Sequence, residues 1–282
     1  MAETVKVFNK NELILDRIRN VTFQDLETKK MLLRLTSVED PSLNCTAEGE
    51  EILDAVGALI TTLYRAKKAT FSGSNSLVSL DLAAAQYGSK KQVAGIDAKQ
   101  ALALGVDAEN EITTYAYETI KVEAPANEGD ACTIKLAYAP NVDSIKYIYN
   151  IENGEIATAY VAGSAATAEE FVVANDGTIT LPTGVTSGTI YVEYTHQSKS
   201  ANRVINRTTD FPTAGRLVIH AYFRDKCTEK LYSGAIICPK AKLNPESVEL
   251  ALTATGKHPF EFTMMKDYCS DDDELFSIIV NN

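Results

Sequence analysis

The sequence predicts a mainly β protein: a β-sandwich or barrel with one flanking α-helix, plus an inserted Ig-like β-sandwich. Two observations support this fold class. Segments of the second half alternate apolar and polar residues with the two-residue period of a half-buried strand. Turn signals rich in Gly, Asn, Asp and Pro separate these segments at intervals of about 8–12 residues, which is typical of sandwiches and small barrels.

The first element in chain order that can be read from its pattern is 51–65, "EILDAVGALITTLYR". Its apolar residues fit one helical face, with acidic residues before them and basic residues after, as a helix dipole prefers. Gly57 and the β-favouring "LITTLY" argue for a strand instead. The pattern predicts a helix, with a strand as the alternative.

A second helix is predicted over 76–87, where "LAAAQ" favours helix. Asn75 or Ser76 can cap its first turn and Gly88 can end it. Three residues share one face and are expected to pack this helix against the sheet: Leu77, Leu80 and Ala84.

The strands follow in five segments with regular alternation, and such alternation indicates antiparallel sheets with one covered face. They are "ACTIKLAY" (131–138), "GTIYVEYTH" (188–196), "RLVIHAYF" (216–223), "SVELALTA" (247–254) and "PFEFTMM" (259–265). We therefore expect an Ig-like sandwich at 112–197, without the Cys and Trp pattern of antibody domains. Residues 1–111 and 198–282 would form the remaining β-sandwich core.

Composition limits the function. The 282 residues have a formal net charge of −11 and a pI near 4.9, which predicts repulsion from nucleic acid and from anionic membranes. This net charge is still compatible with a surface along which DNA moves without binding. The N-terminus lacks the apolar core of a signal peptide, so we expect synthesis in the cytosol. Five widely spread cysteines suggest free buried thiols.

No catalytic, cofactor or metal site is predicted, and hence no enzyme. The stretch 66–91 has the glycines, hydroxyls and lysines of a phosphate cradle, but Gly73 and Gly88 stand too far apart for a Walker loop. The three histidines lack metal-ligand spacing, and no G-x-S-x-G elbow occurs. The acidic run 267–274 lacks the glycine of a calcium loop, which leaves a solvated loop or a weak cation site.

Two lysine pairs bracket the predicted helix 76–87: Lys67 and Lys68, and Lys90 and Lys91. A solvated face is the simplest interpretation. The alternative is a subunit contact, in which these lysines meet acidic residues of a neighbour and fix its register.

Three segments together resemble tail tube proteins (major tail proteins) of long-tailed bacteriophages. They are "LYRAKKATFSGSNSLVSLDLAAAQYGSKKQVA", "AYFRDKCTEKLYSGAIICPKAKLNPESVELALTATGKHPFEFTMMKDY" and "DGTITLPTGVTSGTIYVEY". The resemblance implies a tail-tube-like β-sandwich flanked by the helix at 76–87, with subunits joined into hexameric rings that stack into a tube. It implies that 51–65 runs partly as strand and that 112–197 decorates the outside.

The same resemblance implies a structural virion protein of the tail, assembled in the host cytoplasm. Its partners would be copies of itself and other phage tail proteins, and phage DNA would pass through the tube without specific binding or membrane contact. The alternative is another virion decoration or host-surface binding protein with an Ig-like domain. We hypothesise that Glu249 and Glu261, opposite Leu250 and Phe262 on their strands, line the lumen and repel DNA phosphates.

Overall fold

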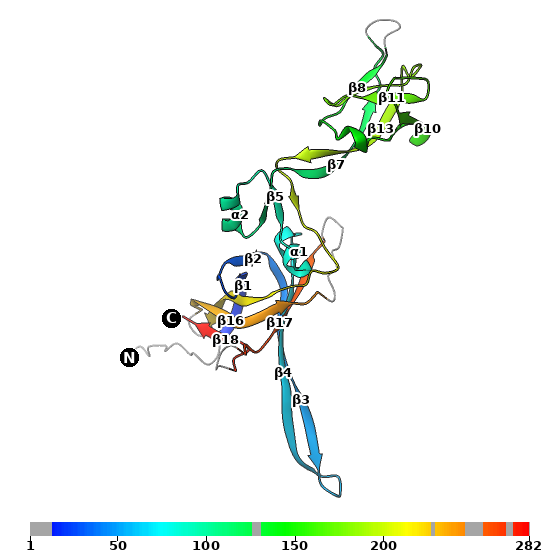
Figure 1. The fold of residues 1–282 in the computed structure, drawn as a ribbon. Coiled ribbons are helices and arrows are strands. Elements are labelled where there is room, and N and C mark those ends of the chain that lie inside the picture. The colour runs from blue at the N-terminus through cyan, green and yellow to red at the C-terminus, as the bar shows by residue number, and fades with distance from the viewer. Residues whose placement is uncertain (1–12, 126–130, 227–228, 246–255, 269–272, 282) are drawn as a thin grey trace. The chain divides into compact units, whose positions relative to one another are not determined.

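The structure, a computed structural model, describes residues 13–125, 131–226, 229–245, 256–268 and 273–281. It is mainly β with two short α-helices (Figure 1), so the predicted fold class is confirmed. The strands are β1 (Leu13–Asp25), β2 (Met31–Leu35), β3 (Val38–Leu53), β4 (Leu59–Asn75), β5 (Gln92–Ala94), β6 (Asp107–Glu109), β7 (Ile112–Lys121), β8 (Thr133–Lys135), β9 (Tyr147–Glu152), β10 (Glu155–Ala162), β11 (Glu170–Val173), β12 (Thr178–Thr180), β13 (Thr189–Ser198), β14 (Asn202–Arg203), β15 (Ala214–Asp225), β16 (Leu231–Leu243), β17 (His258–Met264) and β18 (Ser277–Val280). The helices are α1 (Leu80–Tyr87) and α2 (Ala98–Leu104), and a 3₁₀ turn spans Val142–Ser144.

The chain divides into two compact units. Met1–Lys91, Leu102–Asp107 and Val204–Asn282 form the first, whereas Gln92–Ala101 and Ala108–Arg203 form the second. Each unit has its own hydrophobic core.

The first unit is built on an eight-stranded sheet with the order β2-β1-β15-β16-β17-β4-β3, in which β18 also pairs with β16. Its core contains Phe23, Phe71, Phe260 and Phe262, whose rings lie 5.2 Å (Phe23–Phe262) and 5.7 Å (Phe71–Phe260) apart. The alternation predicted for 216–223 and 259–265 is confirmed. In β17 every second residue from His258 to Met264 is buried.

Residues 51–65 form strand and turn, so the helix predicted there is wrong. They belong to the long hairpin β3–β4, which extends away from the rest of the first unit's sheet (Figure 1). At its turn, Asp54 Oδ1 accepts hydrogen bonds from the N–H groups of Val56 (2.9 Å) and Ala58 (2.7 Å). Gly57 has φ +84°, a conformation that glycine adopts without strain.

Helix α1 is shorter than the predicted 76–87, because Ser79 and not Asn75 or Ser76 caps it. Ser79 Oγ accepts a hydrogen bond from Leu82 N–H, and Gly88 ends the helix at φ +70°, as expected. The predicted packing face is also corrected. Leu77 precedes the helix and is 65% exposed, and Leu80 is 43% exposed. The buried side chains of α1 are Leu82, Ala83, Ala84 and Gln86, so only Ala84 of the predicted three is buried.

Helix α2 was not predicted. It begins after Asp97, whose Oδ1 accepts from Gln100 N–H at 2.7 Å, while Gln100 Oε1 accepts from Asp97 N–H at 3.1 Å. This reciprocal pair is a capping box. The signal is present in "DAKQ" (97–100) and would have located the helix. The strands β5 and β6, which flank α2 in the sequence, form a three-stranded sheet with β14 in the order β14-β5-β6.

Two hairpins of the first unit, β1–β2 and β15–β16, share a turn sequence. Both read F-x-D-x-x-T-x-K, from Phe23 to Lys30 and from Phe223 to Lys230. The backbone bonds repeat as well: Asp25 N–H donates to Lys30 O at 2.9 Å, and Asp225 N–H donates to Lys230 O at 3.1 Å. The sheet therefore contains the same turn, with the same backbone hydrogen bond, at two hairpins.

The second unit holds a seven-stranded sheet with the order β7-β13-β9-β10-β11-β12-β8, in which only β10 and β11 pair in parallel. Its strands contribute to one core that includes Ile134, Ile148 and Ile190, so the sheet curls into a nearly closed barrel. Across the open seam, Glu118 Oε1 of β7 accepts from Ala137 N–H, which follows β8, at 2.9 Å. An Ig-like arrangement of 112–197 stays a prediction.

Candidate assembly surfaces

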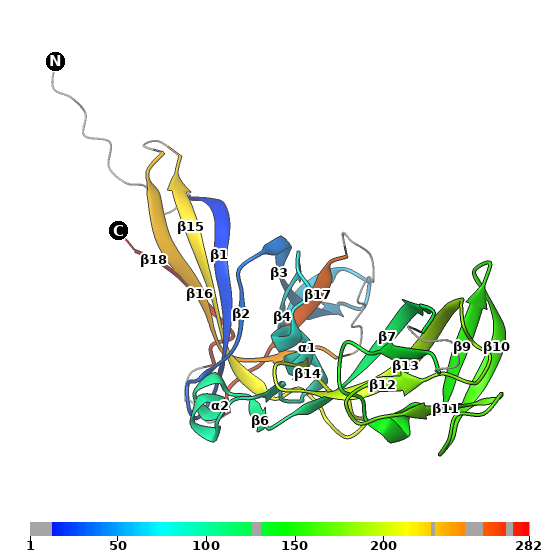
Figure 2. The same cartoon turned by 90° about the horizontal axis from the view of Figure 1, so that it is seen from above.

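The most regular surface of the first unit is a four-stranded ribbon, β1–β15–β16–β18, formed where the N-terminal half of β1 pairs with the C-terminal half of β15. Leu13 pairs with Asp225 and Ile18 with Ala221, while β16 pairs on its far side with β18. These strands lie side by side and extend together in Figure 2. We call this set of strands the ribbon.

Both outer edges of the ribbon are unpaired among the described residues. On one side, β2 pairs only with Val21–Gln24 of β1, which leaves 13–20 open. On the other side, β18 has a partner only in β16. Asn281 N–H donates to Ser233 O at 2.8 Å, and alternate residues of a strand point their N–H groups to the same side. The N–H groups of Ile278 and Val280 therefore point outward, away from β16.

One face of the ribbon packs on the core of the first unit. Leu217 and Ile219 of β15 point to that core, whereas His220 and Tyr222 point to the other face, which we call the outward face. On the outward face, Arg224 donates to Asp16 Oδ1 through Nε (3.2 Å) and one terminal nitrogen (2.8 Å). The guanidinium carbon of Arg17 lies 5.5 Å from the ring centroid of Tyr222. Two arginines of this face are thus already engaged within the chain.

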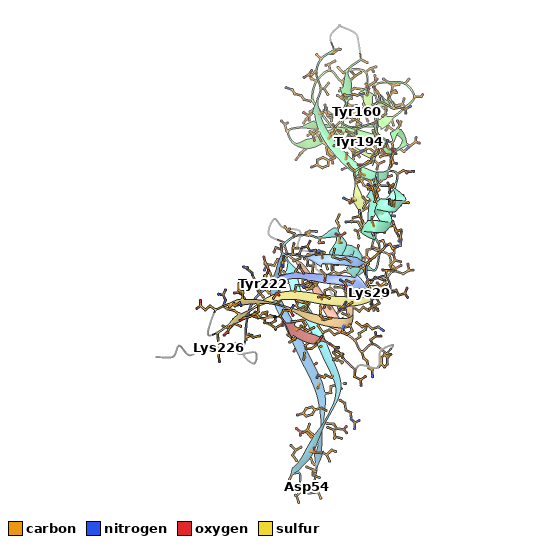
Figure 3. All side chains as sticks on the ribbon, turned by 90° about the vertical axis from the view of Figure 1, so that its left-hand side faces the viewer. Lys29, Asp54, Tyr160, Tyr194, Tyr222 and Lys226 are labelled. Carbon is orange, nitrogen blue, oxygen red and sulfur yellow. The ribbon has the colours of Figure 1, made fainter. Side chains whose placement is uncertain are left out.

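The hairpin β3–β4 exposes apolar side chains that a soluble monomer would normally bury. Val56 is 89% exposed and Ile60 63% exposed, and Asp54 marks the tip in Figure 3. The remaining exposed apolar or aromatic side chains of this part of the hairpin are Ile52, Leu53, Leu59, Leu63 and Tyr64. So many exposed apolar side chains on one hairpin indicate an interaction surface.

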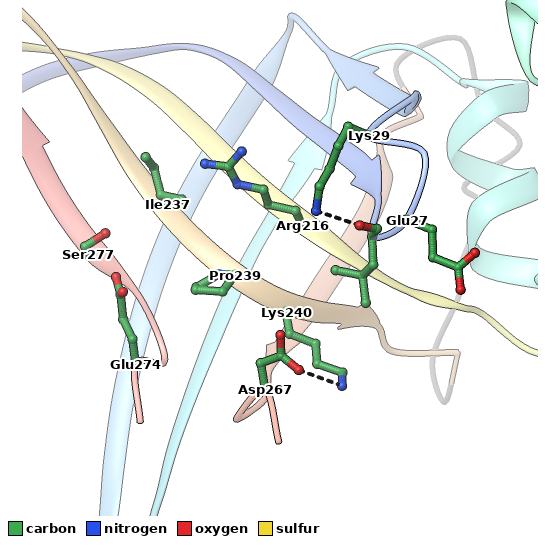
Figure 4. Close-up of a pocket in the computed structure, with 10 residues that line it drawn as sticks. Glu27, Lys29, Arg216, Ile237, Pro239, Lys240, Asp267, Glu274 and Ser277 are labelled. Carbon is green, nitrogen blue, oxygen red and sulfur yellow. Dashed lines mark hydrogen bonds and ion pairs between the residues drawn. The ribbon is translucent and has the colours of Figure 1, made fainter. Parts of the chain in front are cut away.

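A cavity of about 650 Å³ lies beside the turn between β1 and β2 (Figure 4). Its wall mixes the cations Lys29, Arg216 and Lys240 with the carboxylates Asp267 and Glu274. Lys29 Nζ donates to Leu26 O at 2.6 Å, and Lys240 Nζ lies 3.3 Å from Asp267 Oδ1. The Lys240–Asp267 pair is neutralised, and no geometry in this cavity resembles a nucleophile with its base.

The family of the chain follows from comparison with known families. The model of the YomU/Tube protein family matches residues 99–275, more than half of the 282 residues. The chain belongs to this family. Comparison with curated proteins finds none that matches. The tube family is a structural one, and the match indicates no catalytic family.

Within the described ranges, no helix has the length and apolar character that crossing a membrane requires. Likewise, no group of three or more His, Cys, Asp or Glu side chains in the described part of the chain could hold a metal ion.

The structure places three of the four predicted contact lysines beside carboxylates of the same chain. Lys68 Nζ lies 3.7 Å from Glu48, Lys90 Nζ lies 3.9 Å from Asp107, and Lys91 Nζ lies 2.5 Å from Asp81. Lys67 has no ion-pair partner among the described residues. A role for these lysines between tube subunits stays a prediction.

Of the two carboxylates predicted to line the lumen, the structure describes Glu261 and not Glu249. Glu249 lies outside the described residues. Glu261 lies on the face of β17 opposite Phe260 and Phe262, as its alternation predicts, and its Oε1 accepts from Asn244 Nδ2 at 3.0 Å. The open ribbon edges were missed because strand pairing between distant segments cannot be read from alternation. The apolar hairpin was missed because its apolar residues at 51–65 were assigned to a helix.

Proposed function

We propose that the chain is the tail tube subunit of a long-tailed bacteriophage and assembles with its own copies into stacked hexameric rings. The ribbon with two open edges is the observation that carries this proposal. The family match supports it at the coarser level of a tube protein.

Ring formation follows from the two edges being different. The outward edge of β18 in one subunit pairs with residues 13–20 of β1 in the next, which adds a strand to each side of every ribbon. Such a contact is heterologous, and heterologous contacts close into a ring when the rotation between subunits permits. The exposed Ile14, Leu15, Ile278 and Ile279 would be covered at this joint.

Stacking of rings uses the hairpin β3–β4. Its apolar side chains from Ile52 to Tyr64 would be buried against the adjacent ring, which removes them from water. The two lysine pairs that flank α1 in the sequence would help to fix the register between subunits, with Lys67 still unpaired in the described part of the chain.

One face of the ribbon covers the subunit core, so the outward face, which carries Arg17, Tyr222 and Arg224, would line the bore. DNA would then pass Arg17 and Arg224, both engaged within the chain, and would make few lasting phosphate contacts. Glu261, on the non-core face of the neighbouring strand β17, and Glu249 would add repulsion. Changing both to Lys should leave tubes assembled and impair DNA delivery, whereas normal infectivity would remove them from the bore.

The direct test is assembly of the purified chain. We expect sedimentation velocity to detect a discrete ring species as the concentration rises, and negative-stain images to resolve a central hole and then tubes. A chain that remains monomeric at every concentration, or assemblies without a hole, would overturn the proposal. Within a virion, the expected neighbours are other tail proteins at the two ends of the tube.

A further inference from the structure

The outer face of the second unit's barrel concentrates five tyrosines on three adjacent strands, three of them exposed and two half-buried. They are Tyr115 and Tyr117 of β7, Tyr191 of β13, and Tyr147 and Tyr149 of β9, which we call the tyrosine face. Register brings them together, because β13 pairs with β7 on one side and with β9 on the other, with Tyr191 directly opposite Tyr149.

The rings of the tyrosine face are close and accessible. Ring centroids are 6.2 Å apart for Tyr117 and Tyr191, and 6.4 Å apart for Tyr149 and Tyr191. Tyr115 is 88% exposed, Tyr117 73% and Tyr147 51%. On the opposite side of the same strands, Ile148, Ile190 and Val192 pack into the core of the barrel and support the tyrosine face. The five tyrosines are not part of that core.

The charged side chains on the tyrosine face limit the class of ligand that it can bind. On the outward positions of β7, β13 and β9, the only charged side chains are Lys121 and Glu193, which offset one another in a chain of net charge −11. The Glu193 carboxylate accepts a hydrogen bond from Tyr191 Oη at 2.5 Å. The rest of the rim is uncharged: Thr113, Thr119, Thr189, Thr195 and Gln197.

We propose that the tyrosine face binds a neutral pyranose polysaccharide. The negative π-face of a tyrosine attracts the polarised C–H groups on the flat side of a sugar ring. A tyrosine side chain also loses little conformational entropy when it binds a ligand. Hydroxyl and amide groups at the rim would bond the sugar hydroxyls. A nearly balanced face offers no excess of cations for a sulfated or phosphorylated chain. This activity goes beyond tube assembly and does not depend on it.

The test is calorimetric titration of the full chain with cellohexaose, maltohexaose and chitohexaose, and with a heparin hexasaccharide as the anionic probe. We expect at least one neutral hexasaccharide to bind and heparin not to bind. Tyr117→Ala with Tyr149→Ala should weaken binding roughly tenfold or more. The corresponding Phe variants keep the rings and should bind within about threefold of the parent.

A matched control is Tyr268→Ala, since Tyr268 is 84% exposed and belongs to the first unit; it should bind like the parent. Three results would overturn the proposal: no binding of any neutral hexasaccharide, equal binding by the double Ala variant, or preferential binding of heparin. Loss of ring or tube assembly in the double Ala variant would assign this face to a subunit contact and overturn it too.

Discussion

Nδ1 of His258 accepts a hydrogen bond of 3.3 Å from the backbone N–H of Ser79, the residue that caps helix α1. Because an N–H can only donate, Nδ1 is unprotonated and Nε2 carries the proton, which it donates to Gln86 Oε1 at 2.7 Å. Gln86 Nε2 in turn donates to Pro259 O at 2.8 Å. This chain of bonds fixes α1 to β17 and requires a neutral imidazole.

This contact predicts a pH dependence of stability. Burial lowers the pKa of His258 below its ordinary value of 6.5. Below pH 6.5 the unfolded chain gains a proton that the folded chain resists, so the free energy of unfolding should fall as pH falls from about 6.5 toward the folded pKa. Calorimetry between pH 7.5 and 5 should record a smaller slope for His258→Gln; an unchanged slope would mean that another group is responsible.

The turn between β1 and β2 predicts a stability loss on substitution. Asp25 Oδ1 accepts from Glu27 N–H (3.1 Å), Thr28 N–H (2.7 Å) and Thr28 Oγ1 (2.7 Å), and the bonds with Thr28 and Glu27 lower the pKa of Asp25. Asp25→Ala should reduce the free energy of unfolding by about 1 kcal/mol in urea titrations. Asp25→Asn keeps an acceptor oxygen and should lose less; equal losses would contradict this account.

The ribbon edge predicts opposite effects for two neighbouring prolines. Ile278→Pro removes an N–H that points outward, so the subunit should fold with nearly the parent Tm but fail to form rings. Ile279→Pro removes an N–H that points toward β16 and should lower the Tm of the subunit itself. Calorimetry and sedimentation velocity distinguish them. Normal rings from Ile278→Pro would exclude β18 from the joint.

The hairpin tip predicts a variant that forms rings but not tubes. Val56→Ser, Leu59→Ser and Ile60→Ser together should leave the Tm unchanged, because these side chains are 89%, 57% and 63% exposed, and should abolish stacking in electron micrographs. Leu102→Ser, at a 68% exposed leucine of α2, is the matched control and should form tubes. Tubes from the triple variant would contradict a stacking role.

The Asp16–Arg224 ion pair leads to a prediction about how tightly the proposed bore binds DNA. Asp16→Ala removes the oxygen that accepts both Arg224 bonds and so releases the guanidinium, and tubes should then bind short duplexes more tightly. The slope of log affinity against log salt should steepen by about one for each phosphate that a released arginine neutralises. Asp176→Ala likewise removes a carboxylate, one that lies 2.6 Å from Lys135 Nζ, but it belongs to the second unit, and it should leave DNA binding unchanged. Equal effects would place Arg224 away from the DNA.

Sequence patterns correctly predicted the side chains that pack in a core within the chain. The alternation in β13, β15 and β17 was confirmed because one face of each strand packs on a core of the same unit. Leu77, Leu80 and the apolar residues of 51–65 misled the prediction for one reason: the rule that apolar side chains seek a core assumes that the core is in the same chain. Here those side chains remain exposed.

The candidate surfaces needed three-dimensional register. The ribbon joins Leu13 to Asp225, and the tyrosine face joins Tyr149 to Tyr191, across distances in sequence that no local pattern spans. Glu261 was correctly placed on the polar side of its strand, because that assignment uses only the two-residue period.

The exposed apolar side chains of the hairpin tip have a consequence for handling the purified subunit. If they stack rings as proposed, ordered stacking and amorphous aggregation would compete for the same side chains. A substitution that makes the subunit more soluble would then also prevent its polymerisation.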